Sequence, residues 1–240
     1  MLQNWVETRP YDLVVVLILI GLLICIYKRL ASGSRNTGIL AAHIFLVFGL
    51  TCSLYPVYIT LDPLLGGHNI LNLFQRLGIG VSGWIVTRSL SRLLSTPGQD
   101  AQKPYVGSYG WLVLIVLGLV GSFIGMNADE TSRGLDSYST TTIYYLMYQI
   151  FTLLGFLVGA PYLIPRLKKQ VKWLQSKYLK LQSQLFIASY ASSVICTFLY
   201  VAAWISTRFV SLREVFVYLT VITFVSAFFM AVKDKEQQMF

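Results

Sequence analysis

The chain has 240 residues, of which 55% are apolar and 12% charged, and its mean hydropathy is +0.64. An ordinary soluble domain carries about 25% charged residues, so this composition excludes a soluble globular protein and indicates a polytopic membrane protein. The formal net charge of +9 would suggest a nucleic-acid ligand in a soluble protein. Here most of the excess lies between apolar segments, where membrane topology accounts for it, and we expect no nucleic-acid partner.

Seven apolar segments follow one another along the chain. A helix needs about 20 apolar residues to cross roughly 30 Å of bilayer hydrocarbon, and each segment meets or approaches that length. The segments cover residues 13–27, 39–60, 70–93, 111–126, 141–164, 185–206 and 215–232. We therefore predict an all-α fold, a single seven-transmembrane-helix bundle that occupies residues 1–240.

The connections between these segments differ in charge from one to the next. One alternating set holds fourteen Lys and Arg and three acidic residues, whereas the other set, which includes the N-terminus, holds four Lys and Arg and seven acidic residues. Positively charged connections are retained on the cytoplasmic side. We therefore expect a multi-pass protein of the plasma (cytoplasmic) membrane, N-out and C-in.

Residues 166–184, between the fifth and sixth segments, are the most basic part of the chain and are called the basic arm below. Apolar residues recur there every three or four positions, which predicts a helical cytoplasmic linker with an apolar stripe. The basic arm has no acidic residue, and its basic side chains are Arg166, Lys168, Lys169, Lys172, Lys177 and Lys180. One interpretation is contact with a cytoplasmic protein partner or anionic membrane lipid; the other is that the arm only fixes topology.

Arg76 is an ionisable residue inside a predicted span. A charge is costly there, so Arg76 is a candidate for a functional role. It shares a helical face with Gly80 and Gly83, so we expect it to face neighbouring helices. We hypothesise a ligand-binding polar cluster open to the outside, formed by Asp62, Gln75, Arg76, Tyr144, Tyr148 and Gln149. The alternative is that Arg76 extends to the membrane interface and Asp62 caps the turn before Pro63.

Three further polar features lie within the segments. His43 is the second ionisable group, and we interpret it as a neutral imidazole bonded to a backbone carbonyl or water. Gly121 and Gly125 form a GxxxG pattern that suggests a homodimer contact. The sixth segment has small and polar residues on one face, which favours packing against another helix and leaves a solute path as the alternative; these residues are Ser189, Ser193, Cys196 and Tyr200.

Several chemistries lack the residues they need. Cys25, Cys52 and Cys196 lie within apolar segments and form neither a CxxC pair nor a Cys/His cluster, so we expect free buried thiols and no metal site. No Asp or Glu lies deep in a segment, which argues against an acid/base pair or proton-coupled transport. The sequence has no GxSxG, HExxH or phosphate-binding loop. We expect no cofactor, no catalytic residues and no enzymatic activity.

Residues 53–90 resemble one group of proteins. The matching features are Pro56 and Tyr58, the pair Leu61 and Asp62, the pair Leu65 and Gly66, and the pair Asn69 and Leu73. They are similar to a seven-helix membrane module of uncharacterised actinobacterial proteins, catalogued as transporters or found beside transcriptional regulators. The resemblance implies a seven-helix bundle and no established activity. Such proteins normally carry a C-terminal cytoplasmic domain that is missing from this sequence. If the output of the group resides in that domain, we expect a partner to supply it here, or the output to be absent.

These features lead to three functional expectations. The first is a non-enzymatic membrane protein of sensory or regulatory type, in which the outer polar cluster is coupled to the basic arm. The second is a small-solute transporter or permease, with Arg76 and the polar face of the sixth segment along its path. The third, an intramembrane enzyme that modifies lipid, is the least favoured because no acid/base pair is visible.

Overall fold

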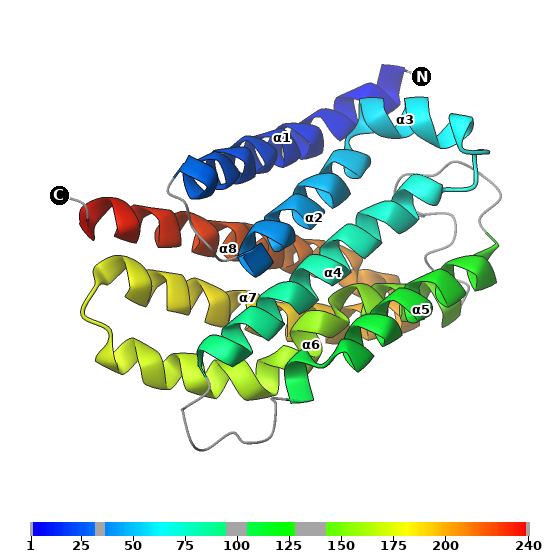
Figure 1. Ribbon diagram of the computed structural model, residues 1–240. Coiled ribbons are helices and arrows are strands. Elements are labelled where there is room, and N and C mark those ends of the chain that lie inside the picture. Colours follow the sequence, from blue (N-terminus) through cyan, green and yellow to red (C-terminus); the bar gives the residue numbers. More distant parts are fainter. Residues whose placement is uncertain (1, 32–36, 95–104, 128–142, 239–240) are drawn as a thin grey trace.

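The computed structural model of the chain describes residues 2–31, 37–94, 105–127 and 143–238, and these residues form helices joined by short turns, without a strand (Figure 1). The fold is therefore all-α, as the composition predicts. The elements are α1 (Leu2–Ala31), α2 (Thr37–Ser53), α3 (Tyr55–Leu64), α4 (Ile70–Leu93), η1 (Tyr105–Gly107), α5 (Tyr109–Met126), α6 (Ile143–Trp173), α7 (Lys177–Ile205), η3 (Thr207–Phe209) and α8 (Val210–Gln238).

Within the described residues, five helices are long and apolar enough to cross a membrane: α1, α5, α6, α7 and α8. The bent pair α2 and α3 counts as a sixth when it is taken as one span. The remaining predicted span is α4, which carries Arg76, Arg88 and Arg92 along its length. The structure thus supports a membrane-embedded helical protein with five to six candidate spans.

The second apolar segment is broken, which the sequence analysis did not anticipate. It predicted one helix over residues 39–60, whereas α2 ends at Ser53 and α3 begins at Tyr55, with a bend of 83° between them. Pro56 causes the break, because its ring clashes with a preceding helical turn and it has no N–H to continue the hydrogen bonding. Leu54 adopts an extended conformation at this point. α3 crosses one end of the bundle, which we call the α3 end (Figure 1).

α4 occupies the middle of the bundle and packs against α2, α5 and α6 (Figure 1). Close backbone approach explains this position: a Cβ added to Gly78 would lie 2.6 Å from the carbonyl oxygen of Phe45, and one added to Gly155 would lie 2.7 Å from the backbone N of Trp84. The ring of Phe156 covers Gly83. A Cβ added to Gly80 would lie 3.1 Å from the Ile115 side chain on α5. The face of Gly80 and Gly83 therefore meets neighbouring helices, as predicted.

The basic arm is divided between two helices. α6 continues through Pro165 to Trp173, the chain turns at residues 174–176, and α7 begins at Lys177, where the Leu179 N–H donates to the Ser176 side chain at 3.3 Å. At 1.5 Å per residue, α6 with its 31 residues is about 46 Å long, which exceeds roughly 30 Å of hydrocarbon. The helical prediction is confirmed, but the arm is a helical hairpin rather than a single linker helix, at the end opposite α3 (Figure 1).

The GxxxG glycines of α5 face different surroundings. Gly125 is covered by the ring of Tyr144 from α6, whereas a Cβ added to Gly121 would meet nothing within 4 Å. One glycine of the pattern is thus used within the chain, and the homodimer contact stays a prediction. All three cysteines are buried and free, as predicted.

Candidate functional site

Asp62 lies in the last turn of α3 and is fully buried. Its carboxylate accepts hydrogen bonds from the backbone N–H groups of Asn69 and Leu71, both at 3.2 Å. These N–H groups belong to the N-cap and the first turn of α4. They have no acceptor within the helix, and the N-terminus of a helix attracts negative charge. Asp62 therefore holds the turn after Pro63 rather than the turn before it.

The side chains around Asp62 complete this turn. The Tyr58 hydroxyl donates to Oδ1 of Asn69 at 2.7 Å, and Asn69 has a left-handed backbone with φ of 59°. Gly66 and Gly67 also have positive φ values, which glycine adopts without steric cost. The junction of α3 and α4 is thus built largely by residues that carry the resemblance to the actinobacterial module. They include Tyr58, Asp62, Gly66 and Asn69.

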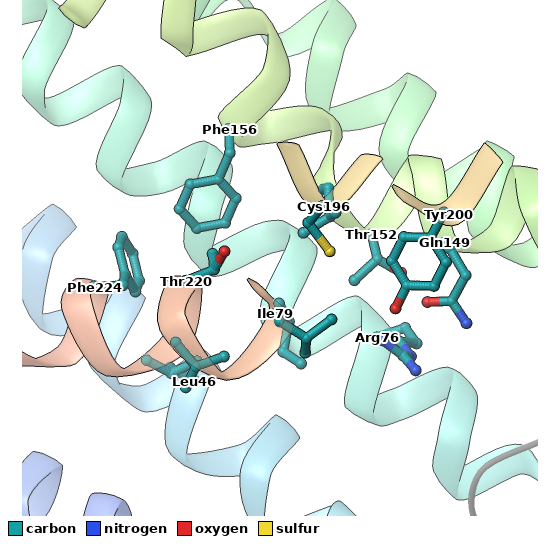
Figure 2. A pocket seen from close by; sticks show the side chains of 13 residues that line it. Leu46, Arg76, Ile79, Gln149, Thr152, Phe156, Cys196, Tyr200, Thr220 and Phe224 are labelled. Atoms are coloured by element: carbon teal, nitrogen blue, oxygen red, sulfur yellow. The ribbon is translucent and has the colours of Figure 1, made fainter. Parts of the chain in front are cut away.

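A pocket lies inside the bundle beside Arg76, with a volume of about 50 Å³. α2, α4, α6, α7 and α8 all contribute side chains to it. Arg76, Gln149, Thr152 and Tyr200 gather at one side of the pocket, and Phe156 and Phe224 lie at the other (Figure 2). The full lining is Leu46, Arg76, Ile79, Gln149, Thr152, Leu153, Phe156, Cys196, Tyr200, Val217, Thr220, Val221 and Phe224.

Gln149 is the most informative residue of this pocket. Its side chain is 1% exposed, and neither Nε2 nor Oε1 of its amide has a hydrogen-bond partner in the described part of the chain. Burying a polar group without partners costs roughly 1–3 kcal/mol. Figure 2 shows the amide beside Tyr200 and Arg76, at the polar side of the pocket. In the pocket, a bound molecule could therefore accept a hydrogen bond from Nε2 of Gln149 and donate one to its Oε1.

The six residues of the predicted outer cluster separate in the structure. Arg76 and Gln149 line the same pocket. Asp62 holds the junction of α3 and α4, and the Tyr148 hydroxyl donates to Oδ1 of Asn72 at 3.1 Å in a buried link between α6 and α4. Gln75 is buried on α4. Tyr144 is 45% exposed and packs on α5 instead.

The polar face of the sixth segment has two roles. Cys196 and Tyr200 line the pocket, whereas the Ser189 hydroxyl donates to the backbone oxygen of Thr220 on α8 at 3.2 Å. Sequence reasoning missed Thr152 and Thr220 as pocket residues. Thr152 follows Gln149 by three positions and so shares its helical face, a signal that could have been used.

An aromatic layer closes the pocket on the side away from α3. It consists of Phe156, Phe186, Phe224 and Phe228, and the Phe224 ring centroid lies 5.0 Å from those of both Phe156 and Phe228. Phe186 completes the layer at 5.9 Å from Phe228. His43 borders it at 4.2 Å from Phe228. Its Nδ1 donates to the Ile39 carbonyl oxygen at 2.6 Å, as predicted.

A second cavity of about 210 Å³ lies on the other side of the aromatic layer. Phe186 and Phe228 form part of its wall, together with residues of the basic arm such as Gln170 and Gln182. The two cavities use the same helices at successive levels: α8 contributes Phe224 to the first and Phe228 to the second. They are therefore stacked along the bundle with the aromatic layer between them.

The basic arm presents its charges on the surface. Lys168, Lys169, Lys172, Lys177 and Lys180 are exposed, and Trp173 at the tip of α6 is 79% exposed. Arg166 lies over the ring of Tyr162, with 3.6 Å between the guanidinium carbon and the ring centroid. Leu167 turns inward to the core, and so does Phe186, which follows the arm on α7. The arm therefore combines an apolar inner stripe with a cationic outer surface.

No family model, curated protein or solved structure matches this chain. The basis for a functional proposal is thus the pocket, the aromatic layer and the basic arm.

Proposed function

We propose that the chain is a sensory or regulatory membrane protein that binds a small ligand in the pocket of Arg76 and Gln149 and transmits this binding to the basic arm. One observation carries the proposal: the same two helices build both places. α6 supplies Gln149 to the pocket and its last turns to the arm, and α7 supplies Tyr200 to the pocket and its first turns to the arm. A packed helix that shifts at one end also moves at the other, which couples the two sites.

The proposal includes a topology of seven crossings in the plasma membrane, N-out and C-in. α4 supplies the additional crossing, because it is surrounded by α2, α5 and α6 and can direct polar side chains such as Gln75 and Thr87 to protein. The pocket then lies in the outer half of the bundle. The basic arm then lies in the cytosol, where positive residues are retained, and meets a cytoplasmic partner or anionic lipid.

The coupling can be tested without a known ligand by filling the pocket. Val217→Phe places a ring in the pocket, and we expect it to change amide hydrogen exchange across residues 166–184 in a lipid nanodisc. The matched control is Ile124→Phe, because Ile124 is 70% exposed on α5 and lies outside the pocket. Equal exchange in the arm of Val217→Phe, Ile124→Phe and the parent chain would refute the sensory proposal.

A second candidate function, a permease for small solutes, is favoured by the stacked cavities. A closed layer between two cavities on one axis is the arrangement that a permease needs when its path is shut. The bend between α2 and α3 also places a discontinuous helix at the α3 end of the bundle. In this function, Phe156 and Phe224 would move apart to join the two cavities.

Sided labelling separates the two functions. Thr220→Cys in the first cavity and Ser183→Cys in the second would each be probed with a membrane-impermeant thiol reagent, in a chain with Cys196→Ala. A permease exposes Thr220→Cys to reagent from both sides in turn. A sensor exposes Thr220→Cys to reagent from one side only, and that result would exclude the permease function.

Membership of the actinobacterial seven-helix group also remains part of the proposal. It is supported by the residues that build the junction of α3 and α4, including Tyr58, Asp62 and Asn69. Exchange of this junction for the matching segment of such a protein should preserve folding. A chain that no longer folds after the exchange would argue against membership.

A further inference from the structure

The pocket of Arg76 and Gln149 contains information about the chemistry of its ligand. The amide of Gln149 has a donor and an acceptor that find no partner among the described residues, and both belong to a side chain that is almost completely buried. Such an amide is costly in an apolar wall unless a bound group satisfies it. A ligand with an acceptor for Nε2, accompanied by a water or a donor of its own for Oε1, removes that cost.

Arg76 determines the sign of the ligand charge. It is the one charged residue in the described lining of the pocket, which includes no Asp or Glu. A guanidinium binds a carboxylate with two parallel hydrogen bonds, and a charge-assisted bond of this kind is roughly twice as strong as a neutral one. The polar side of the pocket therefore favours an anion, and a planar carboxylate in particular.

The remaining wall favours an alkyl group. Leu46, Phe156 and Phe224 line the pocket away from Arg76, and Figure 2 shows the two rings on the far side from the guanidinium. An inorganic anion would give up its hydration here without gaining contacts, whereas a short chain of carbon atoms gains about 0.8 kcal/mol per buried CH₂ group. The volume of about 50 Å³ corresponds to roughly three to five water positions, which limits the chain to about two to four carbons.

We propose that this pocket binds a short-chain monocarboxylate. The carboxylate lies between Arg76 and the Nε2 group of Gln149, and the alkyl chain extends towards Phe156 and Phe224. This inference rests on the proposed function of the pocket and adds the chemical class of its ligand.

The test uses the full chain in a nanodisc of neutral lipid, with sodium butyrate as the probe. We expect butyrate to raise the thermal unfolding midpoint and to bind in calorimetry, while butyramide and sodium chloride at equal concentration do neither. Gln149→Leu keeps the apolar volume and removes both unpartnered atoms, so the variant should fold and bind butyrate at least ten times more weakly. Gln182→Leu is the matched control, because Gln182 lines the second cavity, and it should bind as the parent chain does.

Two outcomes would overturn the inference: butyramide that binds as well as butyrate, or an unchanged butyrate affinity in Gln149→Leu. Failure of the ligand class can be distinguished from failure of the proposed sensory function. If Val217→Phe alters exchange in the basic arm and butyrate does not bind, the ligand class is wrong and the function stands. If butyrate binds through Gln149 and exchange in the arm never changes, the ligand class stands and the function is wrong.

Discussion

The hydroxyl of Tyr190 on α7 lies 2.8 Å from the hydroxyl of Thr87 on α4, and the Thr87 hydroxyl donates in turn to the carbonyl oxygen of Gly155 on α6 at 2.9 Å. Both side chains are fully buried. The Tyr190 ring is also 5.6 Å from that of Phe156. One threonine thus joins three helices next to the aromatic layer that separates the two cavities.

Thr87→Val should therefore destabilise the bundle. The substitution keeps the shape of the side chain but removes the hydrogen bonds that the Tyr190 hydroxyl and the Gly155 carbonyl make with the Thr87 hydroxyl. Each hydrogen bond between membrane helices contributes on average about 0.6 and at most about 1.7 kcal/mol to stability. We expect a loss of about 1–2 kcal/mol in the free energy of unfolding, measured by unfolding in mixed micelles. Tyr190→Phe removes one bond only and should cost less. The double variant should then cost less than the sum of both, because the two residues share one bond.

Asp62 should be important for folding at the α3 end. Asp62→Ala leaves the N–H groups of Asn69 and Leu71 without their acceptor, and loss of a helix N-terminal acceptor costs about 0.5–2 kcal/mol. Asp62→Asn keeps one acceptor oxygen and loses the charge, so it should fall between Asp62→Ala and the parent chain. Thermal unfolding midpoints of the three chains measure this order. Equal midpoints would show that the carboxylate does not hold the junction.

The junction of α3 and α4 also shows what the sequence can and cannot predict about the fold. Helix type and approximate bounds follow from apolar length, because a membrane leaves few alternatives to a helix. The break at Leu54 was missed, although Pro56 marks it, because an apolar run long enough to span a bilayer masks a change of direction. The sequence analysis also treated residues 141–164 and the basic arm at 166–184 as separate elements, whereas α6 continues through Pro165 to Trp173.

The pocket was predictable in part. The sequence analysis grouped Arg76 and Gln149 in one polar cluster because they lie at a similar depth along their helices, and the structure brings them to one pocket. Depth does not determine which side of a helix faces the interior, so Tyr144 was grouped with them although it packs on α5. Asp62 was grouped in the same cluster as Arg76, whereas the hydrogen bonds that it accepts from Asn69 and Leu71 depend on a backbone turn that side-chain periodicity does not encode.

Gly78 should not tolerate a side chain. A Cβ at this position would lie 2.6 Å from the Phe45 carbonyl oxygen and 2.8 Å from the Cα of Gly49, and backbone atoms cannot move aside as a flexible side chain can. We expect Gly78→Ala to lower the unfolding midpoint strongly, with a cost of about 1–3 kcal/mol from overpacking. Gly121→Ala is the control, since its Cβ meets nothing within 4 Å. It should be neutral or stabilising by up to about 1 kcal/mol.

Charge reversal in the basic arm tests whether the arm has a role beyond topology. With Lys168, Lys169 and Lys172 changed to Glu, Arg166, Lys177 and Lys180 still hold positive charge at this end, so we expect the topology to be preserved. In nanodiscs that contain phosphatidylglycerol, hydrogen exchange in residues 166–184 should be slower than in neutral lipid for the parent chain and equal for the variant, because anionic lipid attracts each basic residue by about 1 kcal/mol. Arg208→Glu at the opposite end serves as the control. Labelling of Asn127→Cys from the other side of the membrane would instead show that the three lysines act as a topology signal.

Phe224 should be the residue on which the separation of the two cavities depends most. Its ring touches both Phe156, which lines the first cavity, and Phe228, which lines the second. Phe224→Ala removes the middle of the aromatic layer, and a buried Phe→Ala change costs about 3–5 kcal/mol when the space does not collapse. We expect a lower unfolding midpoint together with labelling of Ser183→Cys from the side that normally reaches only Thr220→Cys. Phe198→Ala controls for the loss of a ring, since Phe198 is 71% exposed on α7, and it should change neither quantity. If Phe224→Ala lowers stability while the two cavities stay separate, the remaining rings close the gap, and the layer acts as packing rather than as a barrier.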